Sequence, residues 1–152
     1  MTTKSRTMKY LRDKGIDPYP ENAESIIQNT GPDGRVYTRK HDLWNIFDIL
    51  SLQPGRGIVG IQACGANDFQ SHIKTLMIDR AEETTRFLLS GGIVELWKWR
   101  SMKQVLKSGK KGTRDIWTPK ICIVSLDGML DTDTGGIIAS FAASGVYETS
   151  TP

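Results

Sequence analysis

Two apolar runs, residues 43–52 and 57–63, joined by a Gln-Pro-Gly-Arg turn, constrain the fold more than any other feature of the sequence. Runs of this length on either side of a Pro-Gly turn are typical of two neighbouring buried strands. The first run contains one acid, Asp48, and the second contains one amide, Gln62. Burying a lone acid is costly unless it is paired, hydrogen-bonded or bound to a metal. Asp48 and Gln62 are therefore the leading candidates for a functional site.

The composition predicts one globular domain that works in an aqueous compartment. The chain has 152 residues, of which 38% are hydrophobic and 24% are charged, enough to bury a core. No apolar run approaches the roughly 20 residues of a membrane helix, and the polar start of the chain is unlike a signal peptide. Cys64 and Cys122 form no Cys-x-x-Cys pattern, which favours reduced thiols over a single disulfide. We expect a cytoplasmic protein with no membrane partner.

The net charge of +3 is unevenly distributed. Residues 98–114 contain seven bases and no acid, whereas residues 125–152 contain acids and no base. A concentrated basic segment favours a polyanionic partner, here DNA, with a solvated basic loop as the alternative. The candidate nucleic-acid-binding residues are Arg39 and Lys40, just before the Asp48 run, and Arg100, Lys103, Lys107, Lys110 and Lys111 in the basic segment.

The remaining patterns predict an α/β fold with a mixed sheet flanked by helices. Expected helices span residues 3–14 and 68–89, and expected strands span residues 23–28, 35–38, 43–52, 57–63, 93–99 and 115–124. Pro119 places the last of these at an edge or a bulge. We divide the chain into an α/β domain, residues 1–124, and a Gly/Ser/Thr/Ala-rich extension, residues 125–152. The apolar part of this extension, residues 136–146, either adds strands or packs as a tail.

Four segments carry a resemblance to a known family: RKHDLWNIFDILSL (39–52), GIVGIQA (57–63), ANDFQSHIK (66–74) and GGIVELWKW (91–99). Together with the order of elements they resemble the PD-(D/E)XK nuclease superfamily, and within it the Holliday-junction-resolvase-like and phage-encoded nuclease-like proteins. The resemblance covers roughly residues 5 to 123. It implies a restriction-endonuclease-like core.

The resemblance also implies a catalytic site. Such nucleases hold Mg²⁺ (or Mn²⁺) between an acid on one strand and an acid at the end of the next, with a lysine two residues later. Here Asp48 fits the first acid, Gln62 stands at the place of the second, and Cys64 stands at the place of the lysine. The implied metal ligands are thus Asp48 and Gln62. Lys74, two turns into the long helix, is the candidate for a relocated catalytic lysine.

Each candidate has a structural alternative. Asp48 could face solvent from its strand, Gln62 could be a satisfied core amide, and Lys74 could be a solvated helix lysine. Asp42 is a candidate second ligand, with a turn or capping role as its alternative. Glu24, on the first expected strand, is a further candidate ligand.

The leading functional hypothesis is a Mg²⁺-dependent DNA endonuclease or junction-resolving nuclease. Because an amide and a thiol replace an acid and a lysine, a catalytically degenerate DNA-binding protein on the same fold is the alternative. A third hypothesis is a phage accessory or interaction protein that assembles through the apolar tail. A homodimer is neither required nor excluded by the sequence.

Overall fold

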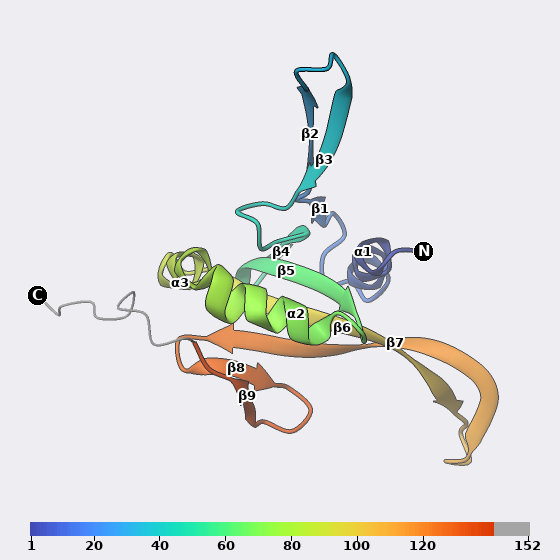
Figure 1. The fold of residues 1–152 in the computed structure, drawn as a ribbon. Helices are drawn as coiled ribbons and strands as arrows, with labels where there is room; N and C mark the ends of the chain where they lie inside the picture. The colour runs from blue at the N-terminus through green and yellow to red at the C-terminus, as the bar shows by residue number, and fades with distance from the viewer. Residues whose placement is uncertain (142–152) are drawn as a thin grey trace, which may run out of the picture.

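The computed structural model describes residues 1–141, which form a mixed α/β structure with helices on both faces of a sheet (Figure 1). Its elements, in order, are α1 (Thr3–Asp13), β1 (Glu21–Asn22), β2 (Ser25–Thr30), β3 (Val36–His41), β4 (Ile49–Gln53), β5 (Gly57–Gly65), α2 (Phe69–Lys74), the π-helical turn η1 (Thr75–Asp79), α3 (Ala81–Leu89), β6 (Ile93–Val105), β7 (Lys111–Ser125), β8 (Gly128–Asp131) and β9 (Ile137–Ala139).

The main sheet of the described residues has seven strands in the order β1-β4-β5-β6-β7-β8-β9. β5 and β6 are parallel, and every other neighbouring pair is antiparallel. The parallel pair arises because the segment from α2 to α3 crosses over between β5 and β6. The mixed sheet flanked by helices is therefore confirmed.

One face of the sheet is covered by α1. Leu11 of α1 is fully buried against Val59 and Ile61 of β5 and against Trp97 and Trp99 of β6. The helix begins at the N-cap Thr2, whose side chain accepts from the backbone of residue 5, as serine and threonine caps do. The predicted helix over residues 3–14 is confirmed to within one residue.

The other face is covered by α2, η1 and α3. Phe69, Leu76 and Met77 pack on Leu96 of β6 and Cys122 of β7. Both cysteines are free thiols, as expected. The predicted single helix over residues 68–89 is wrong in one respect, because it is interrupted by the π turn. That turn closes with a bond from the Arg80 N–H to the Thr75 carbonyl at 2.8 Å, and it lets two consecutive side chains, Leu76 and Met77, both face the core.

The apolar run 43–52 is only partly a strand. Trp44 and Asn45 have φ of 53° and 59°, a left-handed conformation that reverses the chain. Reciprocal bonds of 3.1 Å between the backbones of Leu43 and Phe47 close the resulting loop. β4 therefore begins only at Ile49, and Asp48 immediately precedes the strand instead of lying in its middle.

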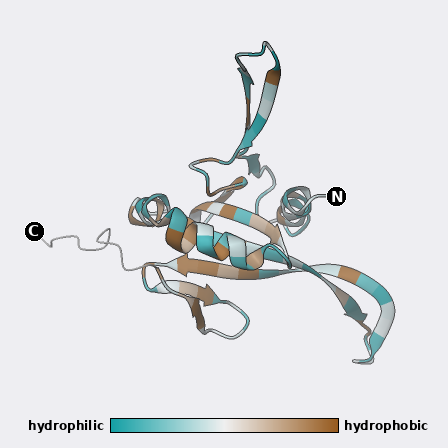
Figure 2. Ribbon diagram, in the orientation of Figure 1, coloured by the Kyte–Doolittle hydropathy of each residue, from teal (hydrophilic) through white to brown (hydrophobic). Residues whose placement is uncertain are grey.

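Two hairpins project from the body (Figure 1). The first, β2–β3, joins the two strands expected over residues 23–28 and 35–38, and it pairs from Ser25↔His41 to Thr30↔Val36 with mostly exposed side chains. The second is formed by the distal parts of β6 and β7. Residues 98–114 are therefore not a simple loop, because most of the basic segment lies on this paired arm. Figure 2 shows hydrophobic residues concentrated on the central strands and hydrophilic residues on the turn of this arm.

The described part of the C-terminal extension belongs to the sheet. β8 pairs with β7 from Cys122↔Asp131 to Ser125↔Gly128, and β9 pairs with β8. The extension thus adds strands, one of the two expected arrangements, and the sheet continues past residue 124. At Pro119, β7 pairs with β6 but lies outside its pairing with β8, which suits a residue without an N–H. The apolar tail beyond residue 141 lies outside the described residues.

Candidate metal centre

Asp48 is a buried carboxylate fixed from two sides. Its side chain lies at the junction of the 43–47 loop with β4, and the residue is only 7% exposed. Oδ2 accepts a bond from the Ala63 N–H at 2.9 Å and another from Gln62 Nε2 at 3.1 Å. The backbone N–H of Asp48 donates to the Ile61 carbonyl at 3.0 Å. β5 therefore holds Asp48 in one orientation and engages one of its two oxygens.

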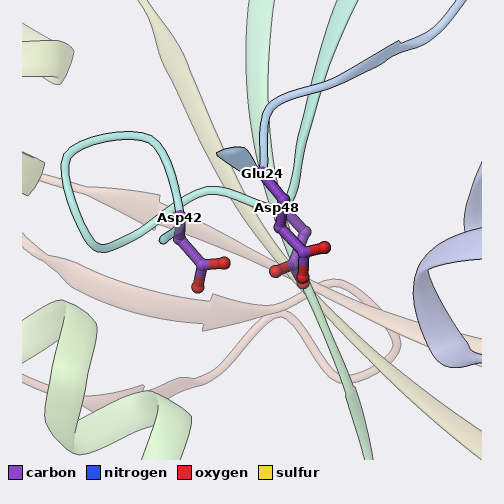
Figure 3. A group of neighbouring side chains, drawn as sticks. All are labelled: Glu24, Asp42 and Asp48. Atoms are coloured by element: carbon purple, nitrogen blue, oxygen red, sulfur yellow. The ribbon is translucent and has the colours of Figure 1, made fainter. Parts of the chain in front are cut away.

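Two further carboxylates meet Asp48. Glu24 lies between β1 and β2, and the neighbouring Ala23 N–H donates to the Asp48 carbonyl at 2.9 Å. Asp42 directly follows β3. One ligand oxygen from each of Glu24, Asp42 and Asp48 lies within 4.8 Å of the others, and Figure 3 shows the three carboxylates directed toward one region. The three carboxylates, one from the β1–β2 connection and two from the ends of the β3–β4 loop, offer the hard oxygen ligands that Mg²⁺ and Mn²⁺ prefer.

The negative charge of this cluster is only partly compensated. Lys4 of α1 forms an ion pair with Glu24 and also donates to Asn22 Oδ1 at 3.3 Å. Burial raises the pKa of Asp48 to about 7, the Ala63 N–H acts in the opposite direction, and the charges of Asp42 and Glu24 raise it further. Burial also raises the pKa of Asp42, as does the charge of Glu24. A divalent cation would relieve the repulsion among these carboxylates, which adds to the larger effect of burial on both pKa values.

His72 faces the cluster from α2. Burial lowers its pKa, while the charges of Asp68 and Asp42 act in the opposite direction. A neutral imidazole beside Asp42 adds no charge to the site. It can accept or donate a hydrogen bond to water near the carboxylates.

The structure brings Gln62 to Asp48, as the sequence indicated. The contact is made by the amide nitrogen, so Gln62 donates to Asp48 and orients it. Ligation of a metal by the Gln62 oxygen stays a prediction. Glu24 and Asp42, the further candidates from sequence, supply the two carboxylates that complete the cluster.

Lys74 lies at the end of α2, where its side chain is 65% exposed and its Nζ is 3.6 Å from Asp79. This pairing favours a solvated helix lysine. Another lysine occupies the region of Cys64: Lys98 is the partner of Cys64 in the parallel register of β5 and β6. Its ammonium lies 4.6 Å from the centre of the Phe69 ring.

Lys98 lies close enough to Cys64 for its charge to act on the thiol. Burial raises the pKa of the Cys64 thiol to about 12, the Asp68 charge raises it too, and the Lys98 charge lowers it. Cys64 is therefore a neutral thiol, and the positive charge beside it comes from the adjacent strand. The spacing of residues along β5 does not point to Lys98. The parallel pairing of strands 57–63 and 93–99 does, because it places Lys98 beside Cys64.

The candidate DNA-binding residues lie mainly on the two projecting hairpins, the β2–β3 arm and the β6–β7 arm. Arg39 and Lys40 are exposed on β3. Lys103 pairs with Asp115 across the second arm at 2.9 Å, and Arg100 lies 3.6 Å from Asp133. The other three, Lys107, Lys110 and Lys111, are exposed at its turn.

No family profile, curated protein or solved structure matches this chain. Within residues 1–141, no helix is long and apolar enough to cross a membrane.

Cation binding should depend on pH through Asp48. A carboxylate must lose its proton to ligate a metal, and the pKa of Asp48 is about 7 before binding. We expect Mn²⁺ affinity to rise up to about tenfold per pH unit below pH 7 and to level off above it. Calorimetry in buffers of different ionisation enthalpy should detect proton release on binding at pH 6 and much less at pH 8. Equal proton release at both values would contradict the assignment.

Proposed function

We propose that this protein is a metal-dependent nuclease that hydrolyses phosphodiester bonds in DNA, with its metal held by Asp48, Asp42 and Glu24. The observation that carries the proposal is the convergence of these three carboxylates within 4.8 Å, beside a sheet with basic arms. The donor set fits Mg²⁺ or Mn²⁺ because all three ligand groups are hard oxygens.

The topology supports a restriction-endonuclease-like core. An antiparallel pair, β4–β5, is followed by a helical crossover to the parallel strand β6, and α1 covers the opposite face. In this core Asp48 directly precedes β4 and Gln62 lies near the end of β5. This is the placement that the resemblance to PD-(D/E)XK nucleases implies for the two strand-borne site positions.

Each residue of the centre then has a defined task. Ala63 and Gln62 engage one oxygen of Asp48, and we assign the cation to the carboxylate from the side of Asp42. Asp42 and Glu24 close the site from the base of the β2–β3 hairpin. When bound, the metal lowers the pKa of a water and stabilises the charge that develops on the phosphate.

Lys98 is the basic residue that we assign to the site. Residues 62 and 64 share one face of β5, because side chains alternate along a strand. Residue 98 pairs with residue 64, so Lys98 lies on the same face of the sheet as Gln62 and Cys64. An ammonium there stabilises negative charge on the phosphate, the task that the thiol of Cys64 cannot perform. Lys4 has a different task, which is to hold Glu24.

The two arms supply contacts to the DNA backbone. The β2–β3 hairpin carries Arg35, Arg39 and Lys40, and the turn of the second arm carries Lys107, Lys110 and Lys111. Such exposed bases contact phosphates without reading sequence. Because Glu24 and Asp42 flank the β2–β3 hairpin, DNA bound along it passes next to the carboxylates.

Cleavage assays test the proposal. We expect the protein to cut linear or branched DNA in Mg²⁺ or Mn²⁺ and to be inactive in EDTA. Lys98→Gln should lower the rate about 10- to 100-fold while leaving Mn²⁺ binding intact, because it removes charge stabilisation and no ligand. Lys9→Gln, which alters an exposed lysine of α1, is the matched control and should cut at the wild-type rate. Absence of cleavage with every metal and substrate would refute the nuclease assignment.

A non-catalytic DNA-binding protein is the second candidate, favoured by the neutral amide of Gln62 and the neutral thiol of Cys64. Both candidates predict electrostatic binding by the arms. Replacing Lys107, Lys110 and Lys111 together by Gln should reduce the slope of log affinity against log salt by about 2 to 3, since each lost phosphate contact removes roughly 0.9. An unchanged slope would show that this arm does not contact DNA. Binding with a normal slope but without cleavage in any metal would favour the second candidate.

A further inference from the structure

A cavity of about 430 Å³ lies beside the loop that connects β3 to β4. Its walls include Trp44 of this loop, Ile58 at the start of β5, Phe87 of α3 and the backbone of Gly91 and Gly92. Trp44 and Phe87 contact each other at a tilt and give the cavity an aromatic side, large enough for a planar group to lie against Trp44. No residue of the metal centre lines it.

The aromatic wall is rigidly supported. The Phe87 ring occupies the space where a Cβ on Gly92 would lie, 2.2 Å from that position, so only glycine fits there. Phe87 packs on Phe47 with ring centroids 4.7 Å apart, and Trp44 leans on both rings at 5.8 and 6.2 Å. Contacts with Phe47 and Phe87 therefore hold the Trp44 indole in place.

Trp44 is nevertheless half exposed, at 51%, and its backbone is strained with φ at 53°. A bulky residue in the left-handed region costs roughly 1 kcal/mol or more. Strained residues are enriched at functional sites, and half of the Trp44 side chain is accessible to a ligand.

The cavity lies a short distance from the metal centre. Trp44 is two residues after Asp42, in the same loop that ends at Asp48. Along β5, Ile58 is four residues before Gln62, which corresponds to about 13 Å at ~3.3 Å per residue. A nucleic acid strand covers that distance with about four stacked nucleotides at ~3.4 Å each, or fewer when extended.

We propose that this cavity binds an unpaired nucleobase of the DNA substrate, stacked on Trp44, a few nucleotides from the phosphodiester at the metal centre. The inference rests on the proposed function and narrows its substrate class to DNA with unpaired bases, such as single-stranded, flapped or branched DNA. Base stacking on an aromatic side chain is tolerant of sequence, so the cavity selects for an unpaired base and not for its identity. The charged residues of the lining are Arg86, which also pairs with Glu82, and Glu83, whose charge is offset by Arg80 at 3.5 Å. Arg86 is the exposed base that suits a neighbouring phosphate.

Binding of short oligonucleotides in EDTA tests the proposal without requiring cleavage. The probes are a labelled single strand of about eight nucleotides, the same strand with abasic sites throughout, and its blunt duplex. All three probes carry phosphates, so the normal and abasic strands differ only in whether they have bases to stack on the protein. We expect the normal single strand to bind about 10-fold or more tightly than the abasic one.

Substitutions test whether the preference for the normal strand arises in the cavity. Trp44→Leu should abolish the preference for the normal strand over the abasic strand, and Ile58→Trp, which fills the cavity from the opposite wall, should do the same. Tyr19→Leu removes an exposed aromatic residue outside the cavity and should keep the full preference.

The outcomes separate this proposal from the proposed function. Equal binding of normal and abasic strands, with Mg²⁺-dependent cleavage intact, would overturn the cavity assignment alone. A preference that survives both cavity variants would also overturn it. A change of oligomeric state in Trp44→Leu with the preference unaltered would assign the cavity to a protein partner instead. Absence of binding to every probe would overturn the cavity assignment, and the cleavage assays in Mg²⁺ or Mn²⁺ would still decide the nuclease assignment separately.

Discussion

Asp48→Asn should lower Mg²⁺-dependent cleavage at least a hundredfold and, in the same protein without metal, raise stability. The first effect follows because the substitution removes a charged ligand, and loss of even an outer-shell partner of a metal site costs about 10- to 100-fold. The second follows because asparagine retains an acceptor for the Ala63 and Gln62 donors but removes one of three crowded negative charges.

The stability gain has a defined pH dependence. The pKa of Asp48 is raised from 3.8 to about 7 by folding. Between these values the folded protein holds a proton that the unfolded chain has lost, so the stability of the wild type falls as pH rises from about 4 to about 7. The advantage of Asp48→Asn should therefore grow over this window and be complete above pH 7. The pKa difference sets an upper limit near 4 kcal/mol, and we expect about 2 kcal/mol because water reaches the neighbouring carboxylates.

Denaturant unfolding of the metal-free wild type and Asp48→Asn at pH 5 and pH 8 measures this effect. Asp127→Asn, in the β7–β8 turn, is the matched control, since its side chain is exposed. It should alter neither cleavage nor the pH dependence. A variant Asp48→Asn that is destabilised equally at both pH values would show that Asp48 is a structural acid.

Glu95→Ala should destabilise the fold by about 3 kcal/mol, through a buried network on the α1 side of the sheet. The Glu95 carboxylate is almost fully buried and accepts from Arg56 Nη2 at 2.6 Å and from Trp97 Nε1 at 2.8 Å. Arg56 also donates to Gln53 Oε1 at 2.6 Å. Removing one partner of a buried pair leaves the others without compensation, which costs about 3–5 kcal/mol, and the partial exposure of Arg56 places this case at the lower end.

Chemical denaturation measures the Glu95 effect, with Asp13→Ala as the control. Asp13 pairs with Lys9 on the surface of α1, where both side chains are more than half exposed, so its loss should cost less than about 1 kcal/mol. Because Glu95 faces the opposite side of the sheet from Asp48, Mn²⁺ affinity should be unchanged in Glu95→Ala at temperatures where it is folded. A loss of affinity would mean that the two faces are coupled. The two buried acids thus respond in opposite directions: neutralising Asp48 stabilises, whereas removing Glu95 destabilises.

The sequence predicts the centre of this molecule better than its periphery. The β5 strand and the contact of Gln62 with Asp48 follow from apolar runs of strand length separated by a turn that joins adjacent strands. The convergence of Glu24 and Asp42 does not follow from any periodic pattern. It depends on the pairing of β1, only two residues long, with the start of β4.

Other features lack a local sequence signal altogether. Trp44 and Asn45 adopt positive φ without a glycine, so the run 43–52 resembled one continuous strand. The π turn preserves the apolar spacing on either side of it, and the long helix therefore appeared unbroken. The distal parts of β6 and β7 contact no core, so their residues show no alternation of apolar and polar side chains that would distinguish an arm from a loop.

The central claim is that Glu24, Asp42 and Asp48 form one divalent-cation site. A crystal of the protein soaked in Mn²⁺ tests it most directly through the anomalous scattering of the metal. We expect one strong peak within ligand distance of all three carboxylates, about 2.0–2.1 Å from their oxygens as for Mg²⁺, and no such peak in Asp48→Asn. Absence of the peak from the wild type, or its persistence in Asp48→Asn, would contradict the claim.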